Sequence, residues 1–516
     1  MTCKRFQIPP QQSLNKVENF LQQKISNLNK SNRKLTRYYL DTLDWRLLTN
    51  EYYLRAEHHG EEEYILQLYK TDSESLITQF HSPELPTLST TLGHSKLATL
   101  LTPLLEERAL LPQIGLNITQ QIFSLENESD KTTAQFFIEN ERLLYPKQEK
   151  SIALKTLSIH QFRGFESAFK LKDKHLLNQL SLTPLEQTPI EMWISHLGLN
   201  TELFLTPEVH LTPDMRTDIA AKTILKSFHH DINVNKEVVE KDIDPECLHE
   251  FRVAVRRTRS FLAQVPKIIP QHQLIRFKKQ FAELGAVTTH QRDLDVMLLE
   301  FNDYLNMLPE NQHIDLEPVR QFVQKQRNAT FADVKKYLQS AKYKRFMESW
   351  GNFLSQEVPK HSSLGNATLP VEQVANKCIW KTYKKLMKQG RKITNESEDI
   401  ELHDLRKTGK KLRYLIEFFS SLHPKKEIKQ VIKTLKLLQN NLGEFQDLHV
   451  HQELISQIKN EMEQAKELTD NTAHAIEQLG KVLELKHYQC RQEFHDTFAK
   501  FSKPGHQAIF IKLYKS

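Results

Sequence analysis

The hydrophobic and polar positions of this 516-residue chain change rhythm partway along it. Residues 37–70 and 117–160 break into short runs of β-branched and aromatic residues, which are typical of strands. Between two of these runs, HHGEEE (58–63) favours a hairpin turn. Residues 14–29 and 90–111 instead space their apolar positions as an amphipathic helix does. We therefore expect an antiparallel sheet or barrel decorated with helices in this part of the chain.

A stretch rich in proline and threonine, residues 186–212, is typical of a linker. From residue 213 onwards helical periodicity continues and few strand signals remain. The expected fold class is therefore α+β with two domains. An antiparallel β tunnel or barrel with helices is predicted at 1–185, and an all-α domain at 213–516.

The all-α region contains an internal repeat. LHEFRVAVRRTRSFL (248–262) aligns with LHDLRKTGKKLRYLI (402–416), which places His249 on His403, 154 residues later (403 minus 249). The same separation aligns RDLDV (292–296) with QDLHV (446–450), and AAKTILKSF (220–228) matches ANKCIWKTY (375–383) one residue out of register. Three matches in the same order predict two tandem copies, at about 213–362 and 363–516, related by a pseudo-two-fold axis.

Composition and charge indicate the compartment and the class of protein, but they do not indicate a function. The formal charge of +7 is a small excess of 71 Lys and Arg over 64 Asp and Glu, so the clustering of charge matters more than its sum. The four scattered cysteines favour free thiols in a reducing compartment. No apolar run is long enough for a membrane span, and the first residues lack a secretory signal. We expect a soluble cytoplasmic protein with no membrane partner.

The two aligned helices concentrate their cations beside a buried seam. The seam is predicted from Leu248, Phe251, Val255 and Leu262 in the first copy and from Leu402, Leu405 and Ile416 in the second. The adjoining face carries His249, Arg252, Arg256 and Arg259, and in the second copy His403, Arg406, Lys410 and Arg413. Arg257 and Lys411 are expected to point further round, towards solvent.

Like charges one turn apart repel, and we expect no acids at the spacing that usually supports a solvated basic face. Arginine suits a partner rich in oxygen acceptors, so these stripes predict a polyanion site, with a solvated face as the alternative. Further lysines join by helical spacing. The full set of candidate binding residues is His249, Arg252, Arg256, Arg257, Arg259, His403, Arg406, Lys410, Lys411, Arg413, Lys222, Lys226, Lys381, Lys384, Lys385, Lys388 and Lys433.

Metal binding is a weaker interpretation of the same region. Asp293 and Asp295 could act as ligands, as could His249, His403 and His449. We favour a role for Asp293 and its counterpart Asp447 in orienting an arginine. No metal and no cofactor are therefore predicted.

These motifs resemble the CHAD domain, the conserved histidine α-helical domain. The resemblance rests on HEFRVAVRRTRS with RDLDV, duplicated as HDLRKTGKKLRY with QDLHV, and covers about 213–516. It implies two four-helix halves about an internal pseudo-two-fold axis. It also implies that the candidate residues bind inorganic polyphosphate in a basic cleft, whereas the residue pattern alone indicates only a polyanion.

The first domain faintly resembles the CYTH domain, an antiparallel tunnel with triphosphatase or adenylyl cyclase activity. The resemblance places Arg55 and Lys70 at positions of substrate-binding cations. The expected Glu-x-Glu-x-Lys strand reads MTCKRFQIP, the second arginine is Glu57, the arginine strand offers Gln120 and Gln121, and the late Glu-x-Glu strand leaves only Lys155. Phosphoryl transfer needs metal held by carboxylates, so we expect a degenerate, catalytically inactive tunnel.

The predicted function is therefore binding of inorganic polyphosphate without catalysis. One alternative is a Mg²⁺-dependent triphosphatase in the first domain. Another is RNA binding, which is disfavoured because the stripes carry few aromatic residues for base stacking, apart from Tyr383 and Tyr414. The first domain could instead hold a protein partner.

Overall fold

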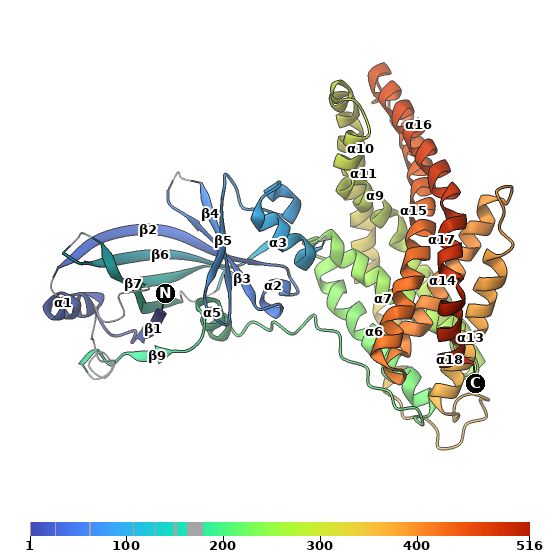
Figure 1. Ribbon diagram of the computed structural model, residues 1–516, viewed down its shortest axis with the longest axis horizontal. Coiled ribbons are helices and arrows are strands. Elements are labelled where there is room, and N and C mark those ends of the chain that lie inside the picture. The colour runs from blue at the N-terminus through green and yellow to red at the C-terminus, as the bar shows by residue number, and fades with distance from the viewer. Residues whose placement is uncertain are drawn as a thin grey trace. The chain divides into compact units, whose positions relative to one another are not determined.

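The computed structural model describes residues 2–25, 27–60, 63–106, 108–128, 131–148, 152–162 and 179–515. The chain forms two compact units, Met1–Leu205 and Thr206–Ser516 (Figure 1). In the described part of the chain, no helix combines the length and the apolar composition that crossing a bilayer requires. The first unit is built on a sheet and the second on helices, which confirms the predicted fold class.

The first unit is one antiparallel sheet with strand order β5-β4-β3-β2-β6-β7-β8-β1-β9. The strands are β1 (Thr2–Ile8), β2 (Leu28–Asp41), β3 (Tyr52–His58), β4 (Tyr64–Lys70), β5 (Leu76–Ser82), β6 (Leu111–Glu126), β7 (Thr132–Tyr145), β8 (Ala153–Gln161) and β9 (Thr183–Leu185). The helices are α1 (Leu14–Lys24), α2 (Arg46–Thr49), η1 (Ser89–Leu92), α3 (Lys96–Leu105) and α5 (Pro189–Leu197). The predicted hairpin turn at 58–63 joins β3 to β4, and Glu61 and Glu62 within it lie outside the described residues.

The long strands alternate between two environments, as a pleated sheet with one enclosed side requires. Helices α1 and α3 each cover an apolar cluster; α1 contributes Val17 and Leu21, and α3 contributes Leu101. Alternate residues of β2, β3, β6 and β7 on the enclosed side carry charge or amide groups around a pocket of about 700 Å³. The sheet unit therefore has apolar cores on its helices and a polar interior.

The predicted linker at 186–212 differs from the structure over its first half. Residues 189–197 form α5, which begins with a capping box between Thr188 and Glu191. Ile190 and Trp193 of this helix are buried in the core of the sheet unit. The two compact units divide after Leu205, so only the later part of the predicted stretch connects them.

The helical unit contains two copies in tandem. The first copy is α6 (Thr217–Val239), α7 (Pro245–Gln264), α8 (Gln271–Val287), α9 (Thr289–Leu299), α10 (Phe301–Asn306), η2 (Glu310–Gln312), α11 (His313–Gln339) and α12 (Ala341–Ser355). The second copy is α13 (Val371–Gly390), α14 (Asp399–Phe418), η3 (Ser420–Leu422), α15 (Lys425–Gln464), α16 (Asp470–Gln492), α17 (Phe494–Phe501) and α18 (Pro504–Tyr514). Figure 1 shows α15 and α16 running side by side, and they are in extensive contact.

Equivalent helices begin at a constant separation. Helices α13, α14 and α15 each start 154 residues after α6, α7 and α8 (371 minus 217, for example), which is the separation found in the sequence. Each copy adds short closing helices to its long ones. The copies differ in one feature next to the aligned motifs: α8 and α9 are separated at Thr288, whereas α15 continues for 40 residues without a break.

Candidate functional site

The central cationic cluster lies where α7 of the first copy packs against α14 of the second. We use this name for Arg252, Arg256 and Arg259 of α7 together with Arg406, Lys410 and Arg413 of α14. The predicted apolar seams are buried on both helices, including Phe251 and Leu405, each fully enclosed. Burial of the seams fixes the rotation of each helix, so the adjoining cationic faces take defined positions.

Arg256 joins the two copies directly. Its Nε donates a hydrogen bond to the Tyr414 hydroxyl at 2.7 Å, across the contact between α7 and α14. The ring of Tyr414 stacks on Phe418, with ring centroids 6.1 Å apart, which holds the hydroxyl in place. The guanidinium of Arg256 is close enough to Arg406 and Lys410 to act on the pKa of both. The two stripes predicted from the sequence therefore meet.

Each copy holds its first arginine in a different way. In the first copy, Arg252 Nη1 donates to the Gly285 carbonyl at 3.0 Å and to Thr288 Oγ1 at 2.7 Å, at the break between α8 and α9. In the second copy, Arg406 Nη2 donates to Asp447 Oδ1 at 3.1 Å. Asp447 therefore contacts Arg406 as an orienting carboxylate does, in line with the role proposed for it above.

The cluster is electrostatically strained because cations outnumber nearby carboxylates. Burial, followed by the neighbouring Arg406 and Arg256, lowers the pKa of Lys410 to about 8. Burial also lowers the pKa of Arg252 to about 10, and Arg256 acts in the same direction. A ligand that brings negative charge between these groups offsets the repulsion and stabilises their charged forms.

One acid in the second copy corrects our expectation that no carboxylate supports the stripes. Glu417 follows Arg413 by one helical turn and accepts a hydrogen bond from Arg413 Nε at 2.6 Å. Its other oxygen lies 3.6 Å from Arg257 Nη2 of the first copy. Arg257 is thus engaged with Glu417 rather than directed only to solvent. The first copy has Ala263 at the equivalent position, so the acid occurs on one side of the cluster.

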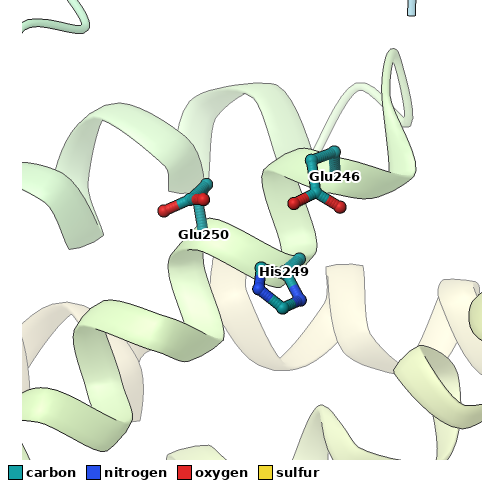
Figure 2. Close-up of side chains that lie close together, drawn as sticks. All are labelled: Glu246, His249 and Glu250. Atoms are coloured by element: carbon teal, nitrogen blue, oxygen red, sulfur yellow. The ribbon is translucent and has the colours of Figure 1, made fainter. Parts of the chain in front are cut away.

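The two histidines have different surroundings. His403 Nδ1 is hydrogen bonded to Gln446 Oε1 beside the cluster. His249 instead projects from α7 beside Glu246 and Glu250, as Figure 2 shows. The candidate ligand atoms of these three side chains lie within 4.8 Å of one another, and within the described residues they are the one grouping able to hold a divalent cation. The second copy has Ile400 at the position of Glu246, so the trio is not repeated.

The other metal candidates are occupied by protein contacts. Asp295 is buried and accepts a hydrogen bond from Arg327 Nε at 2.8 Å, which ties α9 to α11. His449 lies 3.4 Å from Glu453 on the same helix. Asp293 is half-buried near Arg252, and burial raises its pKa. This arrangement matches a structural role for Asp295 better than a metal site.

The remaining candidate lysines do not share the face of the central cluster. Lys222 and Lys226 lie on α6, where Lys222 approaches the Phe353 ring at 5.2 Å and donates to the Gln356 carbonyl of the next segment after α12. Lys381, Lys385 and Lys411 line a separate pocket of about 520 Å³. Three others are exposed outside that lining: Lys384 and Lys388 on α13, and Lys433 on α15.

The sheet unit contains carboxylates that the sequence analysis missed. Glu139 and Glu141 alternate on β7 and line the interior pocket together with Glu57 of β3. All three are buried, and all three lie beside Arg37. Neither Glu139 nor Glu141 lies at a motif position at which the CYTH resemblance leads one to expect a carboxylate. An alternating Glu-Asn-Glu in a predicted strand was the available signal.

Ion pairs fill this interior. Arg37 donates from Nε to Glu57 Oε1 at 2.8 Å and from Nη2 to Glu139 Oε1 at 2.9 Å. Burial alone would raise the pKa of Glu57, but Arg37 and Arg55 hold it at about 2. Burial, with Glu139 beside it, raises the pKa of Glu141 to about 7. The Trp193 indole of α5 donates to Glu141.

The positions expected from the CYTH resemblance divide between the two sides of the sheet. Arg55 and Gln120 line the interior pocket. Lys70 does not line the pocket, and its neighbour Tyr69 does, because successive residues of β4 face opposite sides. Gln121 turns towards Glu18, and Lys155 donates to the Pro10 carbonyl at 2.7 Å. Lys70 and Lys155 are therefore not interior cations.

The chain was compared with known proteins. A family model described as the CHAD domain matches residues 223–456. The solved CHAD domain of the plant Ricinus communis is 24% identical, with a TM-score of 0.48, over 57% of this chain and 95% of that one. PptA from Streptomyces chartreusis is 13% identical, with a TM-score of 0.40, over 57% and 99%.

The sheet unit has its own similar structures. HpAC1 from Hippeastrum, described as an adenylyl cyclase candidate with a dominant triphosphatase activity, is 11% identical, with a TM-score of 0.29, over 38% of this chain and 96% of that one. No curated protein matches the chain. The resemblance to the CHAD family is confirmed over a shorter range than the predicted 213–516. The chain carries a CHAD domain at residues 223–456, within its helical unit.

Proposed function

We propose that the helical unit binds inorganic polyphosphate through the central cationic cluster. The observation that carries the proposal is the position of Arg256, which faces Arg406 and Lys410 across the contact between the two copies. Cations from two helices thereby surround one site. Burial, together with neighbouring cations, lowers the pKa values of Lys410, Arg252 and Arg406 there. A chain of phosphoryl groups supplies closely spaced negative charge and oxygen acceptors for arginine.

Polyphosphate, which carries no bases, suits this site better than RNA does. Single-stranded nucleic acids bind to aromatic platforms on which successive bases stack. At the cluster, Tyr414 is the aromatic residue that contacts a cation, and its ring already packs on Phe418. A polymer that presents only phosphate makes full use of the cations and needs no platform.

Triphosphatase activity of the sheet unit is not part of this proposal. A catalytic Mg²⁺ needs carboxylate oxygens that are free to coordinate it. In the described interior, Glu57 and Glu139 are hydrogen bonded to Arg37, and Glu141 accepts from Trp193. These carboxylates do not fit a Mg²⁺ site as they stand.

Charge reversal at the cluster tests the proposal. We expect the double substitution Arg256→Glu with Lys410→Glu to weaken binding of long-chain polyphosphate by about a hundredfold or more at low salt. The matched conservative variant, Arg256→Lys with Lys410→Arg, keeps the charges and should retain most of the affinity. Lys481→Glu on α16 is the control for a change of net charge, since Lys481 is exposed and outside the cluster.

The measurement is isothermal titration calorimetry on the full chain, with circular dichroism to verify that the helices are intact. Competition with single-stranded RNA of equal total charge separates the two polyanions. Retained polyphosphate binding in the reversed variant would place the site elsewhere. Stronger displacement by RNA than by polyphosphate would favour the nucleic-acid alternative.

A further inference from the structure

A second basic site lies outside the central cluster. A pocket of about 520 Å³ is bounded by the C-terminal end of α7, the segment that connects the two copies, and the helices α13 and α14. Its volume falls in the range of small-molecule sites, about 300–1,000 Å³. Residues of both copies line it, so the duplication creates the pocket.

The charge lining this pocket is entirely positive. Five lysines contribute to the described lining: Lys267, Lys377, Lys381, Lys385 and Lys411. Neither aspartate nor glutamate is found among the lining residues that the structure describes. Lysines at such density repel one another, and a ligand with several negative charges offsets that repulsion. This feature alone would suit any phosphate compound.

Between the lysines, the lining is apolar and neutral-polar. Ala263, Pro266, Leu369 and Val374 supply apolar surface, which inorganic phosphate cannot use. No aromatic ring is present among the described lining residues, so nothing there stacks on a nucleobase. The lining thus favours a ligand with a compact, non-aromatic carbon body.

An unpartnered acceptor adds a second requirement. Gln264 Nε2 donates to Ser260 Oγ at 2.6 Å. Gln264 Oε1 is buried and has no hydrogen-bond partner among the described residues, although the residue lines the pocket. A buried carbonyl without a donor is costly, so the pocket favours a ligand hydroxyl that donates to it. The internal phosphoryl groups of polyphosphate carry no such hydroxyl.

We propose that this pocket binds a small polyol or sugar that carries two or more phosphoryl groups. The lysines hold the phosphoryl groups, and Gln264 Oε1 accepts a hydrogen bond from a hydroxyl of the carbon body. The hydroxyls of Thr382 and Thr408 offer further partners at the same wall. This site is independent of the proposed polyphosphate site: either one can exist without the other.

Fructose 1,6-bisphosphate is the probe, because it combines two phosphoryl groups with several hydroxyls. Pyrophosphate provides the phosphoryl groups alone. We expect calorimetry on the full chain to show fructose 1,6-bisphosphate binding at least about tenfold more tightly than pyrophosphate. Lys381→Glu with Lys411→Glu should weaken the bisphosphate by at least about tenfold, whereas Lys481→Glu should not.

Gln264→Leu distinguishes recognition of the ligand's carbon body from recognition of its phosphoryl groups. It should weaken fructose 1,6-bisphosphate several-fold and leave pyrophosphate unchanged, because it removes the acceptor and no lysine. Cys378, half-buried in the same lining, gives a local readout. Bound fructose 1,6-bisphosphate should slow its alkylation by iodoacetamide, followed by peptide mass spectrometry.

Three results overturn the inference: no binding of the bisphosphate at millimolar concentration, equal affinity for pyrophosphate, or binding that the lysine reversals leave unchanged. If the reversed variant loses helicity, Lys381→Gln with Lys411→Gln takes its place and the same loss is expected. Failure of polyphosphate binding at the central cluster leaves these outcomes unaffected, so the two proposals can fail separately.

Discussion

Arginine is used in opposite ways in the two units of this chain. In the sheet unit, Arg37 is buried and its guanidinium is satisfied by Glu57 and Glu139 at 2.8 and 2.9 Å. In the helical unit, Arg256 donates to a neutral tyrosine and faces two further cations, Arg406 and Lys410. The sheet interior is charge-balanced by its own side chains, whereas the central cluster holds more cations than the carboxylates that contact them.

The difference distinguishes an arginine whose charge is paired within the fold from an arginine whose charge is open to a ligand. A buried ion pair has little net effect on stability while both partners are present, but removal of one partner leaves a buried charge uncompensated. Removal of a cation from an unbalanced cationic site costs little folding stability, because repulsion with the remaining cations is relieved. The same substitution should therefore damage folding in one unit and ligand binding in the other.

The largest effect is expected from Arg37→Met. It leaves Glu57 and Glu139 buried without their partner, and we expect the sheet unit to lose about 3–5 kcal/mol of stability. For a unit of this size the melting temperature should fall by about 10 °C. Differential scanning calorimetry of the full chain measures the change, and polyphosphate affinity should remain within about twofold because the cluster is untouched.

Lys34→Met is the matched control, since Lys34 is exposed on the same strand β2 and its removal should leave the melting temperature nearly unchanged. A similar small shift in Arg37→Met would contradict the structural role assigned to that arginine.

A smaller effect is expected from pH. Lys410 has a pKa of about 8 in the free protein, and a bound polyanion stabilises its charged form and so raises that pKa. Binding therefore takes up a proton above pH 8. The affinity for polyphosphate should be constant below about pH 7.5 and fall by up to about tenfold per pH unit above pH 8.

Lys410→Arg removes this dependence, because arginine remains charged over the same range. Titrations between pH 7 and 9.5 compare the two proteins. An equal decline in both would assign the proton to another group.

The smallest effect is expected from Glu417→Gln. Glu417 competes with the ligand for Arg413 and lies 3.6 Å from Arg257. Removal of its charge should strengthen polyphosphate binding by about twofold to fivefold, in keeping with the modest energy of partly exposed ion pairs. Glu463→Gln, on exposed surface of α15, serves as the control. A weaker complex in Glu417→Gln would show that Glu417 positions the arginines.

Hydrophobic periodicity and the internal repeat were sufficient to predict the architecture and the two cationic stripes that form the central cluster. The residues of the predicted seams, such as Phe251 and Leu405, are buried, and burial of a seam determines where the adjoining cations point. The common separation of equivalent helices follows from the aligned motifs. Helical periodicity and the alignment of the two copies can both be read directly along the sequence.

Contacts between distant segments could not be read in the same way. Glu139 and Glu141 lie beside Arg37 because β7 pairs with β6, and β6 pairs with β2, the strand that carries Arg37. Lys411 is exposed as expected, but the sequence did not indicate that the loop after α7 brings Lys267 to the same pocket. Helical spacing gives the angle of a side chain on its own helix and not what packs opposite it.

The break at Thr288 has a consequence for how a polymer lies in the cluster. An inorganic phosphate chain reads the same from either end, and two identical stripes would give it no preferred direction. Arg252 is held by a carbonyl and a hydroxyl exposed at the break, while the unbroken α15 leaves Arg406 to the carboxylate of Asp447. On the proposed function, the interrupted helix makes the two halves of the site unequal, and a symmetric chain bound there would acquire distinguishable ends.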